Sequence, residues 1–376
     1  MKKSSSKERL IFSAIDLFSR KWFGTVSIAE ICRNAGLSNG LFYKYFKDKE
    51  AVFREILELV ISKISSSVAQ VSGDSPLERL ASFIDIIYGF SQENKALVKV
   101  FREGQYRYFE YEKRLKAVYE HALSFILNSE PDIADYLFGL GGLRFASVRS
   151  AFHQIPIERN RLLEILKVGI FHGLPIDEKK VFSTSITPLP LQIMPDGREK
   201  LLIEGKALFG EKGYFDTNIH EITDKAGLST GAFYTYFESK ESFYAELIHR
   251  VGRDIRHFIT INLPPGLNSL ERELRGLWLF IVYLSIDRTC YSIVREAEFV
   301  LPAEVKIYYG AFTDGYRKHQ DPGIAALDPT SIEFLLGVAH YLGIEVIFDE
   351  SPANARNIIL QLGQLYQNGF AGKFNF

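Results

Sequence analysis

The sequence is poor in the features on which several classes of protein depend. Only two cysteines occur among its 376 residues, Cys32 and Cys290, so we predict neither a disulfide framework nor a cysteine-based metal site. The most lipid-like run, Gly276 to Ile286, has 11 residues, well short of the roughly 20 needed to cross a bilayer. The eight histidines form no HExxH motif. We therefore expect no membrane partner, no metal, no cofactor and no enzyme activity.

Net charge is also nearly absent. The chain has 45 Lys and Arg against 46 Asp and Glu, a net charge of −1, so any attraction to nucleic acid must come from local clusters. The N-terminal stretch is basic, but Asp16 interrupts its apolar residues and their spacing is helical, so we predict no signal peptide. With 47% apolar and 24% charged residues, the composition is typical of a globular protein, and we expect it in a reducing cytoplasm.

What the sequence does have is a long repeat. Residues 28–50 are IAEICRNAGLSNGLFYKYFKDKE, and residues 219–241 are IHEITDKAGLSTGAFYTYFESKE. The two segments align without a gap and are identical at 14 of 23 positions, 191 residues apart. Solenoid units recur every roughly 20–50 residues, so this separation indicates a duplicated domain.

Each copy has the same helix start and stop signals. A capping box predicts the start of one helix, a glycine predicts its end in a tight turn, and a serine predicts the cap of a short second helix. Two helices joined in this way form a helix-turn-helix, whose second helix enters the DNA major groove. In the two copies the capping boxes are Ser27 with Glu30 and Asn218 with Glu221, the glycines are Gly36 and Gly227, the serines are Ser38 and Ser229, and the next helix starts at Asp48 or Ser239.

The shared frame, G-L-S-x-G-x-F-Y-x-Y-F-x-x-K-E, resembles the DNA-binding signature of the TetR/AcrR family of bacterial transcriptional regulators. The resemblance covers residues 7–57 and 200–248. It implies an all-helical protein, with an N-terminal helix-turn-helix and a C-terminal domain that binds a small effector and dimerises. Family members usually carry one copy and bind palindromes as homodimers. Two copies in one chain therefore suggest an internal pseudo-dimer, with further homodimerisation left open.

We predict an all-α fold with two tandem copies of a three-helix helix-turn-helix domain, each followed by a helical effector-binding and dimerisation body. We call the helix-turn-helix domains the first reader (1–50) and the second reader (198–245). The first body spans 51–174 and the second body 246–376. Residues 175–197 hold four prolines and are expected to link the copies.

The resemblance, carried over position by position, implies contacts with double-stranded operator DNA along the second helix of each reader. Small residues there let the helix approach DNA closely, and for the tyrosines the alternative is packing on their own helix. In the first reader these residues are Ser38, Asn39, Gly40, Leu41, Tyr43, Lys44, Tyr45 and Lys49. In the second reader they are Ser229, Thr230, Gly231, Ala232, Tyr234, Thr235, Tyr236 and Lys240. Phe42, Phe46, Phe233 and Phe237 are expected in the core.

The two readers differ in charge. Residues 1–50 contain ten Lys and Arg against five acids, a net +5, whereas residues 198–241 contain six against eight, a net −2. Lys44 and Lys47 of the first reader correspond to Thr235 and Glu238 of the second. Because neutralising phosphates supplies much of the affinity for DNA, we predict that the first reader dominates binding. The alternative is that both readers bind comparably through neutral groups and helix dipoles.

A second repeat lies in the bodies, where VFREGQY at residues 100–106 matches IVREAEF at 293–299. An Arg-Glu pair in an apolar helix must be paired if it is buried, or must meet a polar ligand group. One interpretation is an anchor for an acidic small-molecule effector, formed by Arg102 and Tyr106 or by Arg295 and Phe299. The other, simpler interpretation is a structural ion pair.

Together these features predict a DNA-binding transcriptional regulator, a repressor released or modulated by a small effector, with two covalently linked readers. The alternative is a protein–protein interaction or sensor module in which one or both readers no longer bind DNA.

Overall fold

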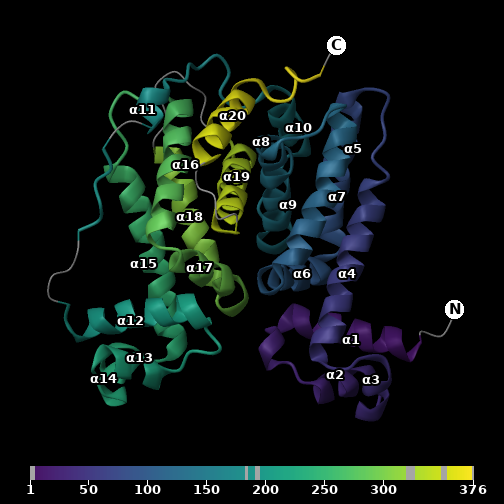
Figure 1. Cartoon of the computed structure of the whole chain (residues 1–376), viewed down its shortest axis with the longest axis vertical. Coiled ribbons are helices and arrows are strands. Elements are labelled where there is room, and N and C mark those ends of the chain that lie inside the picture. Colours follow the sequence, from purple (N-terminus) through teal and green to yellow (C-terminus); the bar gives the residue numbers. More distant parts are fainter. Residues whose placement is uncertain (1–4, 183–184, 191–194, 319–326, 349–353, 375–376) are drawn as a thin grey trace. The chain divides into compact units, whose positions relative to one another are not determined.

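A computed structural model describes residues 5–182, 185–190, 195–318, 327–348 and 354–374 (Figure 1). Within these ranges the chain forms helices and no strand, which confirms the predicted all-α fold. The chain divides into two compact units. Unit 1 consists of Met1–Leu163 with Lys373–Phe376, and unit 2 consists of Glu164–Gly372.

Unit 1 begins with the first reader, a cluster of three helices at one end of the long helix α4 (Figure 1). In the body, α4 packs against α6 and α7, and α5 packs against α9. The reader comprises α1 (Ser6–Arg20), the 3-10 turn η1 (Phe23–Thr25), α2 (Ile28–Ala35) and α3 (Asn39–Tyr45). The body comprises α4 (Lys49–Val68), α5 (Pro76–Glu93), α6 (Lys95–Arg107), α7 (Phe109–Leu127), α8 (Ile133–Tyr136), the π-helical turn η2 (Leu137–Gly141), α9 (Gly142–His153) and the start of α10 (Arg159–Val168).

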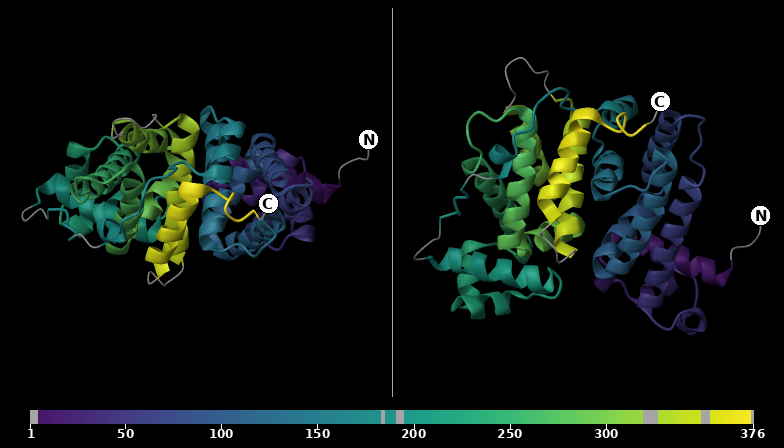
Figure 2. Two further views of the ribbon diagram at one scale, coloured as in Figure 1. Left: turned by 90° about the horizontal axis from the view of Figure 1, so that it is seen from above. Right: turned by 45° about the horizontal axis from the view of Figure 1, so that its top comes forward.

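Unit 2 repeats this plan. The second reader lies at one end of the long helix α15, as the right-hand view of Figure 2 shows in teal and green. In the body, α15 packs against α16 and α18, and α16 packs against α19 and α20. The helices after α10 are α11 (Glu178–Phe182), α12 (Gly197–Lys212), α13 (Ile219–Ala226), α14 (Thr230–Tyr236), α15 (Lys240–Ile261), α16 (Ser269–Ile286), α17 (Thr289–Val300), α18 (Pro302–Lys318), α19 (Pro329–Phe348) and α20 (Ala355–Asn368).

The predicted helix caps are present, with one exception. Asn218 and Glu221 form a complete capping box, but in the first reader only half of the predicted box exists. Ser27 accepts a hydrogen bond from the backbone N–H of Glu30, and the Glu30 carboxylate instead binds Lys21 Nζ at 2.5 Å. Glu221 makes both contacts, because its second oxygen accepts from Asn218 N while the first binds Lys212.

No single helix in the described part of the chain is long and apolar enough to cross a membrane. Helices α16 and α17 are long and apolar enough only when they are taken together, and the angle between them is 98°.

The end of the first copy belongs to unit 2, where it pairs with the end of the second copy. Ile170 N donates to Tyr366 O at 2.7 Å, and in return Phe370 N donates to Leu166 O at 2.8 Å. Glycine is required on both sides, because a Cβ on Gly169 would lie 2.4 Å from Tyr366 O and one on Gly369 would lie 2.4 Å from the Lys167 carbonyl. We call this reciprocal contact, residues 166–171 with 366–371, the end pairing.

The segment expected to link the copies, 175–197, also packs on unit 2 through α11, which contacts α16. Polar side chains of the second body hold its backbone. Arg275 Nη1 donates a hydrogen bond to Val181 O at 2.8 Å. The side chain of Asn262 accepts a hydrogen bond from Thr187 N at 2.6 Å and donates one to Thr187 O at 2.9 Å. The described part of this segment is therefore bound to the second body.

Candidate nucleic-acid interface

Helices α3 and α14 each present one exposed face above a buried pair of phenylalanine rings. Phe42 and Phe233 are fully buried, whereas 59% of Tyr43 and 55% of Tyr234 are exposed. The rings of Phe42 and Phe46 lie 5.5 Å apart, as do those of Phe233 and Phe237. This packing fixes the rotation of each helix, so that the tyrosines face solvent.

The turn before each exposed helix has the geometry that the sequence predicts. Gly36 and Gly227 adopt left-handed conformations with φ of 63° and 67°. Ser38 then caps α3 by accepting from Leu41 N at 3.3 Å, and Ser229 caps α14 by accepting from Ala232 N at 3.1 Å. Both readers therefore contain a complete helix-turn-helix.

Most of the residues predicted to face DNA lie together on these two surfaces. Leu41, Ala232, Lys49 and Lys240 are half-buried, and the others are exposed: Ser38, Asn39, Gly40, Tyr43, Lys44 and Tyr45 in the first reader, with Ser229, Thr230, Gly231, Tyr234, Thr235 and Tyr236 in the second. The match of exposure at equivalent positions means that the readers share one framework.

Lys49 and Lys240 lie differently from the other predicted residues. Lys49 Nζ donates to the carbonyls of Phe23 and Val26, at 2.6 Å each, and lies 4.4 Å from the centre of the Phe23 ring. Lys240 Nζ lies 4.3 Å from the centre of the Tyr214 ring. Burial lowers the pKa of both lysines. A phosphate contact would require Lys49 to leave these carbonyls, so its role at DNA stays a prediction.

Several cations of the first reader are engaged by other groups of unit 1. Lys7 pairs with Glu55, and Arg9 donates to Ala35 O at 2.6 Å. Within the described residues Arg33 and Lys44 make no ion pair, and Lys47 makes only a 4.0 Å contact, to Asp48.

All three of these cations are exposed. At the equivalent positions, the second reader has Asp224, Thr235 and Glu238, which are also exposed. Arg33 and Asp224 were counted in the predicted net charges of +5 and −2, but they were not compared as equivalent positions of the repeat, which the offset of 191 residues makes them. The charge difference on the exposed faces is thus larger than Lys44 and Lys47 alone suggested.

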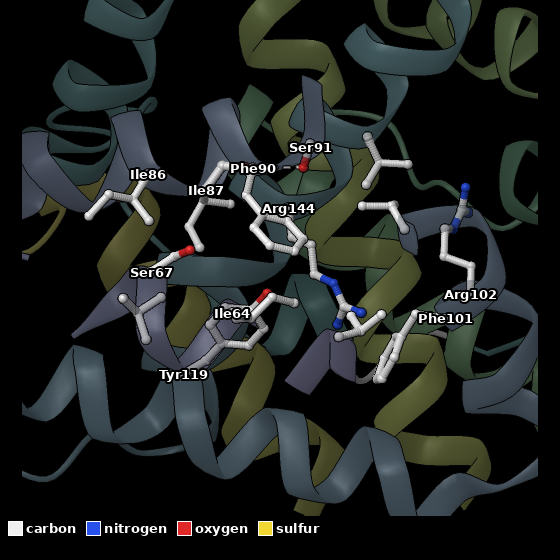
Figure 3. Close-up of a pocket in the computed structure, with 14 residues that line it drawn as sticks. Ile64, Ser67, Ile86, Ile87, Phe90, Ser91, Phe101, Arg102, Tyr119 and Arg144 are labelled. Carbon is white, nitrogen blue, oxygen red and sulfur yellow. Dashed lines mark hydrogen bonds between the residues drawn. The ribbon is translucent and has the colours of Figure 1, made fainter. Parts of the chain in front are cut away.

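The described residues of unit 1 enclose a cavity between α4, α5, α6, α7 and α9 (Figure 3). Its volume is about 30 Å³, which holds about two water molecules. The wall is mostly apolar, with Ile64, Phe90 and Phe101 around the side chain of Arg144, which reaches between them (Figure 3). A drug-sized effector needs roughly 300 Å³ or more, so the helices would have to part to admit one.

The charge of Arg144 is balanced within unit 1. Its Nη1 donates to Glu112 Oε1 at 2.7 Å, and its Nη2 donates to Gln105 Oε1 at 3.2 Å. Tyr119, also in the wall, is buried, and its burial raises the pKa of the phenol to about 12. Arg144 was not among the residues predicted to bind an effector, although an arginine within the apolar run 137–148 is a visible signal in the sequence.

The two alternative effector anchors, one in each body, stay predictions. Arg102 belongs to the cavity wall, whereas the side chain of Tyr106 lies outside the described residues. In the second body, Arg295 and Phe299 are half-buried on α17. Nowhere in the described ranges do three His, Cys, Asp or Glu side chains gather as metal ligands.

Comparison with known proteins identifies the domains. Residues 10–56 and 201–247 both match the family described as bacterial regulatory proteins, tetR family. Two uncharacterized HTH-type transcriptional regulators of Bacillus subtilis are similar in sequence. YuxN is 28% identical over 151 residues, which cover 36% of this chain and 52% of YuxN. YdgC is 35% identical over 83 residues, which cover 22% of this chain and 43% of YdgC.

The chain thus spans about half or less of the length of these curated relatives, which are regulators rather than enzymes. A solved TetR-family transcriptional regulator from Haemophilus influenzae is 20% identical in sequence, and the match covers 45% of this chain and 95% of that one with a TM-score of 0.37. The two domain matches coincide with the two readers, so the chain carries the DNA-binding domain of the tetR family of bacterial regulatory proteins twice.

Proposed function

We propose that this chain regulates transcription by binding double-stranded DNA through α3 and α14. The observation that carries the proposal is the duplicated exposed face, with Tyr43 and Tyr234 above fully buried Phe42 and Phe233. A short, capped helix with small residues near its N-terminus suits the major groove, and its free N–H groups suit phosphate.

The two readers act as one covalent pair, an internal pseudo-dimer. The end pairing supports this, because each copy satisfies backbone groups of the other. The C-terminal tail adds a second link, since Lys373 Nζ binds Asp135 Oδ2 of the first copy at 2.6 Å. A homodimer of a one-copy regulator would have to form such contacts between chains, whereas here they are intramolecular.

A small effector controls the readers from the first body. The cavity around Arg144 supports this proposal, because its wall is mostly apolar and has only two charged groups, Arg102 and Arg144, a kind of lining that ligands favour. Two readers on one face of DNA fit successive major-groove turns when they are ~34 Å apart. Effector binding that favours another spacing would release the DNA.

We assign the chain as a repressor, since an occupied operator blocks transcription without a further partner. The relatives include both directions of control. The repressor DhaR of a Mycobacterium species is 29% identical over 85 residues, and the activator FasR of Mycolicibacterium smegmatis is 26% identical over 121 residues.

The test starts from DNA selected out of a random-sequence pool by the full chain. Binding is then measured by fluorescence anisotropy between 50 and 200 mM salt, with the mass of the complex measured by light scattering. We expect steeply salt-dependent binding and one 42.9 kDa chain per site. Two chains per site would contradict the pseudo-dimer, and no selected sequence at all would contradict DNA binding.

A second candidate function is favoured by the exposed acids Asp224 and Glu238 in the second reader. In this alternative the second reader docks a protein and only the first reader meets DNA. A selected DNA that contains one half-site, whose affinity is unchanged by removal of the Tyr234 ring, would favour it.

A further inference from the structure

The Arg-Glu motif repeated in the two bodies has a structural role that neither interpretation of the sequence included. Glu103 Oε1 accepts a hydrogen bond from the backbone N–H of Phe23 at 2.9 Å, in the loop between α1 and α2. In the second copy, Glu296 Oε2 accepts from the backbone N–H of Tyr214 at 2.7 Å. Both glutamates are buried, with 2% and 8% of their surface exposed. Each body therefore reaches its own reader through one carboxylate.

The loop residue is held from a second side by the long helix that joins reader to body. Lys49, the first residue of α4, donates to Phe23 O at 2.6 Å while its ammonium lies over the Phe23 ring. The ring itself packs against Phe18 of α1 and Phe53 of α4, with centroids 5.5 and 4.8 Å away. Phe23 thus has its N–H bound to α6 and its C=O bound to α4.

The second copy keeps the carboxylate bond to the backbone N–H and the lysine over the ring, although the loop residue is a tyrosine. Lys240 lies over the ring of Tyr214, whose hydroxyl donates to Glu241 at 2.8 Å. The preceding residue is Gly213, with φ of 85°, and a Cβ there would lie 2.9 Å from Glu296 Oε2. In the first copy, the preceding residue is Trp22. What recurs is the bond from a buried carboxylate to a backbone N–H, which makes no demand on the side chain of the loop residue.

A buried carboxylate is a costly way to fasten two helical elements together. Burial raises the pKa of Glu296, and the N–H of Tyr214 opposes that shift. An apolar contact would hold the reader without this cost. A hydrogen bond adds direction, because its strength falls steeply as the angle at the donor narrows. The geometry is therefore suited to fixing the orientation of the reader.

The same helices also line the cavity of the first body. Helix α6 contributes Phe101 and Arg102 to the cavity wall, directly before Glu103 in the sequence, and α4 contributes Val60 and Ile64. A ligand that parts α4 from α6 would move both partners of Phe23. The distance between the groups that hold its N–H and its C=O would then change.

We propose that Glu103 and Glu296 are positioning residues that orient each reader on its body, and that in the first copy Glu103 carries a change in the cavity to the reader. We call Glu103 with Phe23 and Lys49 the first clamp, and Glu296 with Tyr214 and Lys240 the second clamp. The part that concerns the cavity rests on the proposed function. The clamps themselves do not.

The first test is amide hydrogen exchange in the full chain. Glu103→Ala removes the acceptor, so exchange in residues 22–26 should rise about tenfold or more, with exchange in α4 unchanged. Glu103→Gln keeps an acceptor oxygen and should restore most of the protection. Glu296→Ala is the matched variant, and it should affect residues 213–217 and leave 22–26 protected.

A uniform rise in exchange across unit 1 would mean that Glu103 supports stability in general, and it would overturn the positioning role. No rise at all would overturn the clamp itself. If Glu103→Ala fails to fold, Glu103→Gln still tests the clamp, because its weaker bond should raise exchange about threefold in residues 22–26 alone.

The second test uses the DNA selected by the full chain. Glu103→Ala should lower the affinity about tenfold without changing the slope of affinity against salt, because the clamp touches no phosphate. Lys44→Ala should lower that slope by about one. A changed slope in Glu103→Ala would contradict a role in positioning. If the unaltered chain bound no DNA, the proposed function would fail, while the exchange measurements would still decide whether the clamps exist.

Discussion

The two readers have one scaffold and two different surfaces. Their caps, glycine turns, buried phenylalanine pairs and clamps coincide at equivalent positions. Their exposed charges do not, and the differing pairs are Arg33 and Asp224, Lys44 and Thr235, and Lys47 and Glu238. Positions that satisfy the backbone or fill the core permit few residue types, whereas an exposed position tolerates a reversal of charge at little cost in stability. The comparison therefore separates residues that make a reader from residues that give it a target.

The two bodies differ in their cores, whereas the two readers differ on their surfaces. The capping boxes that begin α5 and α16, Ser75 with Glu78 and Asn268 with Glu271, set an offset of 193 residues. At that offset Glu273 replaces the buried Leu80, and Tyr316 replaces the buried Leu123. Tyr316 donates to Glu273 Oε2 at 2.9 Å. The second body thus holds a polar pair where the first body is apolar.

The largest expected effect tests whether the scaffolds are equivalent. Phe42→Ala and Phe233→Ala each remove a fully buried ring and should cost about 3–5 kcal/mol. Each loss should fall on its own reader, which hydrogen exchange in α3 and α14 would report. Phe12→Ala, at a side chain that is 63% exposed, is the control and should change stability little. If one ring proved far less important than the other, the readers would not share a scaffold.

A somewhat smaller effect is expected on the pH dependence of stability, which should differ between the two bodies. Burial raises the pKa of Glu273 from 4.5 to about 7. Because the folded state holds the proton more tightly than the unfolded state, this stabilisation is complete below pH 4.5 and is lost as pH rises through 7. The loss should reach at most about 3 kcal/mol.

The measurement is the free energy of urea unfolding at pH 5 and at pH 8. Amide hydrogen exchange in α16 then reports whether the change lies in the second body. Glu273→Leu, which copies the first body, should remove this part of the pH dependence. Tyr316→Phe is the matched control, since it removes the hydrogen bond and keeps the carboxyl. If Glu273→Leu kept the full pH dependence, other groups would be responsible.

The sequence predicted local features well and long-range contacts poorly. The glycine turns and the serine caps depend on neighbours within a few residues, so the sequence pattern predicts them. They lie at Gly36 and Gly227 and at Ser38 and Ser229. Glu103 was visible as a buried charge, but its partner lies 80 residues away and is a backbone N–H, which has no sequence signature. The contacts of Lys49 could not be predicted for a similar reason, since its two carbonyl partners come together only in the folded loop.

The next effect concerns the difference in surface charge. Lys44→Ala should weaken binding to the selected DNA about tenfold at low salt, because one phosphate contact is lost. Thr235→Ala should change it less than twofold, since the Thr235 hydroxyl already donates to Ala232 O. Thr235→Lys, which copies the first reader, should strengthen binding. Equal losses in the two alanine variants would show that the readers contribute equally.

The smallest expected effect comes from the side-chain oxygens of Ser38 and Ser229, and it distinguishes a role in stability from a role in DNA binding. Ser38→Ala and Ser229→Ala each remove the oxygen that caps a recognition helix, and each should cost about 1 kcal/mol in its own reader. Aspartate caps as well as serine, so Ser38→Asp and Ser229→Asp should keep stability while adding a negative charge. Repulsion from phosphate should then weaken DNA binding in Ser38→Asp much more than in Ser229→Asp. Comparable weakening in both would place the second reader on DNA as firmly as the first, and its acidic face would then need another explanation.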